Sequence, residues 1–80
     1  MKPIRFDRHT KRRMAQRGIS PGEVEAALRH PEQIEPSIKG RVNAFAPGAG
    51  GTVRVTYRES PNEILVVTVV RQRSGGEGKP

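Results

Sequence analysis

The sequence predicts an α+β domain in which two N-terminal helices pack on a three- to four-stranded antiparallel sheet. Two observations lead to this fold class. The first third of the chain carries helix signals, above all the capping-box run Ser20-Pro21-Gly22-Glu23, and the second half carries three β-rich segments separated by glycine and proline turns. With 80 residues the chain has room for one hydrophobic core, so we expect a single domain over residues 1–71.

The N-terminal segment predicts a short strand followed by a helix. Ile4-Arg5-Phe6 alternates between apolar and polar residues, as a short edge strand does. Asp7 is placed to cap a helix that runs from Arg8 to Arg17, and Gly18 is the left-handed residue expected just past its end.

A second helix is expected to follow the capping box. It ends near His30, because the residue before Pro31 is pushed out of the α region. Glu25 and Arg29 lie one turn apart and can pair on its outer face. The expected buried stripe consists of Val24, Ala27 and Leu28.

The remainder of the chain predicts sheet. Residues 32–39 are irregular, and Ile34 and Ile38 are their expected core anchors. The expected strands cover Arg41–Ala46, Thr52–Arg58 and Ile64–Val70. The third is apolar on both faces, which places it inside the sheet. Residues 72–80 are glycine-rich and polar, and we expect a disordered C-terminal tail there.

Composition excludes several classes of site. The chain has no cysteine, so disulfides, thiolate metal sites and cysteine nucleophiles are excluded, and His9 and His30 are the only imidazoles. The glycines at 48, 50 and 51 lack the strand, loop and helix context of a phosphate-binding loop. We therefore expect no metal and no cofactor. The absence of a long apolar stretch predicts a soluble, cytoplasmic protein without membrane contact.

Charge is concentrated at the N-terminus. Residues 1–19 hold seven lysines and arginines against Asp7 alone, a net +6 of the chain's +7. Such a cluster attracts polyanions and predicts RNA as the partner, although an acidic protein would satisfy it too, and so would a plain solvated helix. Because only 32% of the residues are hydrophobic, a bound partner or a homodimer would also help to stabilise the small core.

The first helix carries the candidate catalytic residues His9, Arg13 and Arg17. Their spacing of four residues puts them on one broad helix face. An imidazole can move protons near neutral pH and guanidiniums can hold phosphate oxygens, which suits metal-independent RNA cleavage. The alternatives are a surface histidine, arginines that pair with Glu32 or Glu35, and an Arg17 that stabilises the helix end.

The strands add further candidates. Arg54, with Thr56 and Arg58, lies on one strand face, and it would complete a phosphate clamp only if that face met the first helix. Tyr57, on the other face, is either a core residue or a base-stacking platform. The full set of predicted nucleic-acid contacts is Arg8, Lys11, Arg12, Arg54, Tyr57 and Arg71.

The run from His9 to Ser20, HTKRRMAQRGIS, resembles the signature of the domain-of-unknown-function 4258 family, approximately H-A-x-x-R-M-x-x-R-G-I-S. The likeness continues through the second helix and the paired strands, over about residues 4–71. His9, Arg13 and Arg17 stand at the motif's polar positions. Thr10 stands where the family usually has alanine, so its hydroxyl either tunes the site or marks a tolerant surface position.

This family is similar in layout to RelE- and BrnT-type toxins. The resemblance implies a RelE- or barnase-like ribonuclease fold and an acidic, antitoxin-like protein partner. We therefore expect a toxin-like, metal-independent ribonuclease that uses His9 as general acid or base and Arg13 and Arg17 on the scissile phosphate. The alternative is a non-catalytic basic module that binds RNA or an acidic protein.

Overall fold

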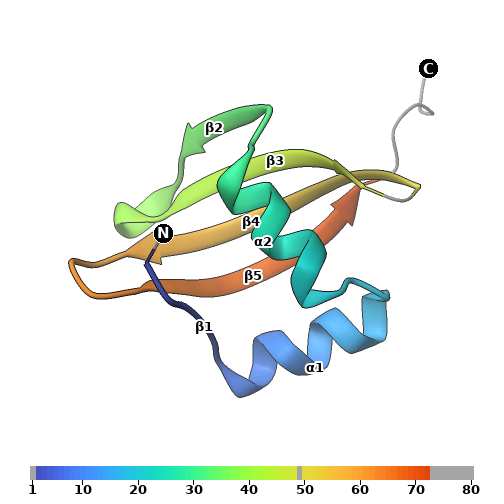
Figure 1. Cartoon of the computed structure of the whole chain (residues 1–80), viewed down its shortest axis with the longest axis horizontal. Coiled ribbons are helices and arrows are strands. Elements are labelled where there is room, and N and C mark those ends of the chain that lie inside the picture. Colours follow the sequence, from blue (N-terminus) through green and yellow to red (C-terminus); the bar gives the residue numbers. More distant parts are fainter. Residues whose placement is uncertain (1, 49, 73–80) are drawn as a thin grey trace.

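Two helices and a five-stranded mixed sheet make up the fold, and the computed structural model describes residues 2–48 and 50–72 (Figure 1). The helices are α1 (Arg8–Arg17) and α2 (Pro21–Arg29), with a short 3-10 turn, η1 (Ile38–Gly40). The strands are β1 (Ile4–Phe6), β2 (Gln33–Pro36), β3 (Val42–Gly48), β4 (Gly51–Glu59) and β5 (Ile64–Gln72). Their order across the sheet is β1-β5-β4-β3-β2.

The predicted α+β class is confirmed, but the sheet has five strands where three or four were expected, and it is mixed, since one of its four strand pairs is parallel. β1 pairs with β5 in parallel, with Phe6 opposite Val66. β2 pairs with β3 where the sequence predicted irregular chain. Its pattern is weak because it is an edge strand, in which Pro36 is tolerated although it lacks an N–H donor. The alternation of residues in a strand indicates which side chains share a face, whereas the strands that pair with it, and their direction, depend on the whole chain.

Both helices begin and end where their capping residues predict. Asp7 Oδ1 accepts a hydrogen bond from the Thr10 amide at 2.7 Å, and Gly18 adopts the left-handed conformation at φ 66° after α1. At α2, Ser20 and Glu23 form both hydrogen bonds of a capping box. The local signals alone therefore determine these boundaries.

The core lies on one face of the sheet, beneath the helices. α2 contacts β3 and β4, while α1 contacts β5 (Figure 1). The prediction that Ile34 and Ile38 anchor the core is wrong, since they are 55% and 69% exposed. Both lie at the margin formed by β2 and η1, outside the cluster that the helices cover. That cluster contains Met14, Ile19, Val24, Ala27, Ala46, Val53, Val55, Val66 and Val69.

A β-bulge in β5 explains how residues three apart both enter this core. Thr56 pairs with Thr68 and Tyr57 with Val66, so Val67 is an extra residue on β5. Strict alternation would turn Val66 and Val69 to opposite faces. With the bulge, both side chains are buried, at 0% and 1% exposure.

The end of β5 differs by one residue from the predicted start of the C-terminal tail. β5 extends through Gln72, one residue into the segment predicted to be a tail, and residues 73–80 lie outside the described part of the chain. No helix within residues 2–48 and 50–72 is long and apolar enough to cross a membrane.

Candidate nucleic-acid interface

α1 lies along the margin of β5 where β1 stops. β1 ends opposite Val66, and beyond that point the backbone carbonyls of β5 bond to side chains of α1. The Thr10 hydroxyl donates to the carbonyls of Val66 and Val67, at 3.3 and 3.2 Å. The Arg17 guanidinium donates through Nη1 to the Val69 carbonyl at 2.7 Å. The helix therefore closes a strand edge that would otherwise expose unpaired carbonyls.

These bonds define the inner line of the helix. At about 100° per residue, Thr10 and Arg17 are seven residues apart and lie almost directly above one another, with Met14 between them. Thr10 and Met14 are 1% and 4% exposed. Arg17 is thus turned toward the sheet, whereas His9 and Arg13 lie further around the axis. Of the three predicted catalytic residues, Arg17 is the one that bonds to the sheet, and His9 and Arg13 belong to the exposed part of the helix.

The same geometry settles the position of Thr10. It is neither a tolerant surface position nor a neighbour acting on His9, because its hydroxyl is buried against the bulge in β5. It donates to two carbonyls of β5 at the point where pairing with β1 ends. We assign Thr10 a structural role.

The outer surface of α1 is cationic, and we call it the basic surface. It consists of Arg8, His9, Lys11, Arg12 and Arg13, all of them exposed. Within residues 2–48 and 50–72, none of these side chains forms an ion pair. Four carboxylates form ion pairs elsewhere, in the couples Lys2–Glu59, Arg5–Glu63, Glu25–Arg29 and Glu23–Arg71.

The charges of α1 work against its own stability. Arg8 and Arg12 are like charges one turn apart, and the first turn holds cations but no acidic residue. Cations are unfavourable at a helix N-terminus, where the helix dipole is positive. Asp7 provides compensation as the N-cap: its hydrogen bond from the Thr10 amide is the main cause that holds the pKa of this carboxyl below the ordinary 3.8.

The positions of α2 and β5 show which way each flank of the basic surface faces. Lys11 and Ala15 line a hollow of about 240 Å³ that reaches Pro21, at the start of α2. His9 and Arg13 each lie two residues from Lys11, about 200° around the axis, and therefore on the opposite flank. Since α1 runs beside β5 at the margin of the helix-covered sheet (Figure 1), the flank with His9 and Arg13 points away from α2 and toward the other side of the sheet.

Among the predicted strand residues, Arg54 and Tyr57 lie on opposite sides of the sheet. Arg54 is on the face that carries no helix, so it cannot complete a clamp on the helix-covered side. Tyr57 packs against the core cluster on the helix-covered face. Burial raises the pKa of the Tyr57 hydroxyl, and the negative charge of Glu59 adds to the effect. Its ring is a core residue, not a platform beside Arg54.

Arg71 belongs to a structural junction. Its guanidinium bonds to both carboxylate oxygens of Glu23, at 3.2 and 3.3 Å, and donates to the Gly18 carbonyl at 2.9 Å. Glu23 Oε1 also accepts from the Ser20 amide. The end of β5, the end of α1 and the cap of α2 are joined in this way, and Arg71 is committed to the fold.

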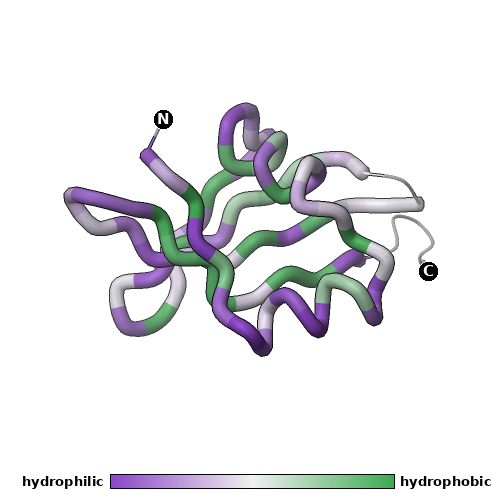
Figure 2. The backbone as a smooth tube through the Cα atoms, turned by 60° about the horizontal axis from the view of Figure 1, so that its bottom comes forward, coloured by the Kyte–Doolittle hydropathy of each residue, from purple (hydrophilic) through white to green (hydrophobic). Residues whose placement is uncertain are grey.

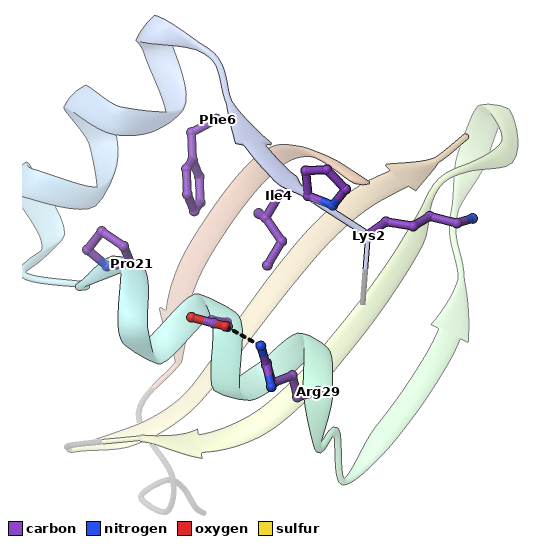
Figure 3. A pocket seen from close by; sticks show the side chains of 7 residues that line it. Lys2, Ile4, Phe6, Pro21 and Arg29 are labelled. Carbon is purple, nitrogen blue, oxygen red and sulfur yellow. Dashed lines mark ion pairs between the residues drawn. The ribbon is translucent and has the colours of Figure 1, made fainter. Parts of the chain in front are cut away.

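Another hollow lies away from all of these candidates. Its volume is about 380 Å³, and it opens between β1 and α2 (Figure 3). Its charged side chains are already paired, Lys2 with Glu59 and Arg29 with Glu25. The lining residues are Lys2, Pro3, Ile4, Phe6, Pro21, Glu25 and Arg29, so it contains no predicted site residue.

Sequence reasoning overlooked residues of β3 on the helix-free face. Asn43 and Phe45 alternate with the buried Ala44 and Ala46, and Phe45 lies opposite Arg54. Arg41 continues the same alternation in extended backbone just before the strand. The period-two pattern was available as a signal, but it indicates a face only once the position of the helices is known.

The side chains available for chemistry on the basic surface are an imidazole, three guanidinium groups and the Lys11 ammonium group. No group of three or more histidine, aspartate or glutamate side chains is placed to hold a metal ion in the part of the chain that the structure describes. The family described as "Domain of unknown function (DUF4258)" matches residues 6–71. No curated protein and no solved structure matches the chain.

Proposed function

The chain belongs to the DUF4258 family, a domain of unknown function, and we propose that it binds RNA through the basic surface of α1. The observation that carries this proposal is the absence of ion pairs on that surface within residues 2–48 and 50–72, while four carboxylates elsewhere pair with lysine or arginine. Cations that neither pair nor stabilise their helix are available to an external polyanion.

The choice of cation favours phosphate as the ligand. Within α1, Arg8, Arg12 and Arg13 are exposed arginines, and Lys11 is the one lysine. A guanidinium matches two phosphate oxygens with two parallel N–H donors, whereas an ammonium acts as a point charge. Carboxylates accept the same pair of donors, but an RNA backbone presents its phosphates as a continuous row of charge, which suits the exposed arginines along α1.

A second candidate function is metal-independent cleavage of the bound RNA, favoured by the exposed position of His9 one turn before Arg13. In this reaction the His9 imidazole accepts the proton of the ribose 2′-hydroxyl, and the 2′-oxygen attacks phosphorus. The bond to the 5′-oxygen breaks, that oxygen takes up a proton, and a 2′,3′-cyclic phosphate forms. Arg13 would stabilise the charge on the phosphoryl oxygens.

One experiment separates binding from cleavage. Labelled single-stranded RNA is incubated with the protein in EDTA, and both bound and cleaved fractions are measured over a salt series. We expect Arg13→Gln to weaken binding about tenfold and to reduce the salt slope by about 0.7. Arg29→Gln, which removes a paired arginine of α2, is the charge-matched control and leaves both unchanged.

His9 has its own test. His9→Ala is expected to abolish cleavage while binding falls by less than about twofold, because Arg8, Arg12 and Arg13 remain to contact the phosphates. Cleavage that persists in His9→Ala removes this residue from the chemistry. Intact RNA with wild-type protein leaves a binding module, and wild-type affinity in Arg13→Gln contradicts the proposed interface.

A further inference from the structure

The helix-free face of the sheet holds two arginine donors that folding leaves without an acceptor. Within the described residues, the buried side-chain nitrogen and oxygen atoms lacking a hydrogen-bond partner are Arg41 Nε and Arg54 Nε. Arg54 lies on the face opposite the helices, and Arg41 continues the alternation of Asn43 and Phe45 on that face. A buried N–H without an acceptor is unfavourable, and because both arginines are partly exposed, their guanidinium groups are open to an anionic ligand on this face.

An aromatic ring lies beside these donors. Phe45 pairs across the strands with Arg54, and Arg54 pairs with Val70 of β5. All three are partly exposed on a face that no helix covers. A nearby polar pair joins the same strands, because the Thr56 hydroxyl donates to Asn43 Oδ1 at 2.7 Å. The face thus combines an open ring, guanidinium groups and amide donors.

The charge of this face is mostly positive. Arg5 is neutralised by Glu63 at 2.7 Å, while Arg58 forms no ion pair within residues 2–48 and 50–72. Glu35 is the acidic residue of β2 on this side, and it accepts from Gln33. With Arg41 and Arg54 added, the face repels a second copy of itself and attracts a polyanion.

The face also continues from the basic surface. His9 and Arg13 lie on the flank of α1 that faces away from α2, at the margin of β5. From β5 to β3 is two strand spacings, about 10 Å. A ligand held at His9 and Arg13 can therefore cross Val70 and reach Arg54 and Phe45 without passing over a helix.

We infer that this face binds a single strand of RNA, with Arg54 and Arg41 on its phosphates and Phe45 stacked on a base. The inference rests on the proposed RNA binding and specifies its substrate class. In a duplex the faces of the bases are covered by their neighbours, so a ring lying on a sheet has nothing to stack on. Stacking on an aromatic side chain needs unpaired bases and tolerates any sequence.

The test compares one RNA strand with the same strand annealed to its complement, by fluorescence anisotropy. We expect Phe45→Leu and Arg54→Gln each to weaken single-strand binding about tenfold, equal to 1.4 kcal/mol, with duplex binding changed by less than about twofold. Arg29→Gln is the control on the helix-covered side, and thermal melting confirms that each variant is folded. Should Phe45→Leu unfold, Arg54→Gln and amide chemical-shift mapping on wild type carry the test.

The outcomes separate this inference from the proposed function. If Arg13→Gln weakens binding while Arg54→Gln and Phe45→Leu do not, the sheet face is excluded and the α1 interface stands. If none of the three variants changes affinity, both proposals are wrong. Equal losses for single strand and duplex would contradict base stacking, and self-association that depends on Phe45 would identify a second copy as the occupant.

Discussion

α1 and α2 are neighbouring helices of similar length that follow opposite rules for charge. α2 has a capping box, an acidic residue in its first turn, a basic residue in its last turn and an ion pair between Glu25 and Arg29. α1 has five lysines and arginines and no acidic residue, and much of its length is hydrophilic in Figure 2. α2 is therefore explained by folding alone, whereas the charges of α1 require another reason.

What holds α1 in place is a small number of contacts on its inner line. The Asp7 cap, the buried Met14 and the bonds from Thr10 and Arg17 to β5 all lie on or near that line. The basic surface adds nothing to these contacts. The comparison predicts that variants of the junctions lower stability, while variants of the basic surface weaken ligand binding without lowering stability.

The largest effect on stability is expected at the junction between α2 and β5. Arg71→Met removes the bonds to Glu23 and to the Gly18 carbonyl. The pair is partly exposed, at 20% and 26% for the two side chains, so we expect a loss of about 2 kcal/mol in the free energy of unfolding in urea. A change below about 0.5 kcal/mol would show that the junction is not needed.

Thr10→Val tests the contact between α1 and the bulge. The substitution keeps the shape of the side chain but leaves the carbonyls of Val66 and Val67 without their donor. We expect the free energy of unfolding to fall by about 1.5 kcal/mol, and RNA affinity to stay within about twofold of wild type. Equal stability of the two proteins would contradict the role assigned to the hydroxyl.

Acid should weaken α1 through its cap. The folded-state pKa of Asp7 is lowered, so its contribution is present above the unfolded value of 3.8 and is lost as pH falls through the lower folded value. Asp7→Asn still accepts the hydrogen bond but does not titrate, and Asp7→Ala loses about 1 kcal/mol at neutral pH. Melting curves between pH 7 and about 2.5 should show a smaller acid-induced decrease for Asp7→Asn.

The smallest expected change in stability comes from Arg12→Glu, which separates the effect of charge on stability from its effect on RNA binding. Arg12→Glu removes the repulsion from Arg8 and should raise the stability of the fold by about 0.3 kcal/mol. The same change should weaken RNA binding at least tenfold, because it replaces a phosphate contact by a repulsive charge. Glu25→Arg in α2 is the mirror-image control, since it breaks an ion pair and should lower stability slightly. A stability loss in Arg12→Glu would indicate that the charges of α1 serve the fold.

The sequence predicted those parts of the fold whose causes are local. The Asp7 and Ser20 caps, the Gly18 end of α1 and the Glu25–Arg29 pair depend on residues within one turn of one another. The strand status of residues 33–36 and the parallel direction of β1 depend on partners far along the chain. Ile34 was misplaced for the same reason, since an edge position cannot be recognised from the residue itself.

The candidate site also has features that the sequence predicts and features that depend on the tertiary structure. The cationic character of α1 follows from composition, and the exposure of His9 and Arg13 agrees with it. Arg17 was grouped with them by its spacing of four, although its spacing of seven from Thr10 indicates the inner line equally well. The choice between the two lines depends on where β1 ends beside β5, which is a tertiary feature.

The most direct test of the account measures stability and RNA affinity on one variant, Arg8→Gln combined with Arg12→Gln and Arg13→Gln. The account predicts an unfolding free energy equal to or above that of wild type and an affinity for single-stranded RNA reduced by at least about a hundredfold at low salt. An unchanged affinity, or a loss of stability large enough to unfold the protein, would contradict the claim that the charges of α1 serve a ligand and not the fold.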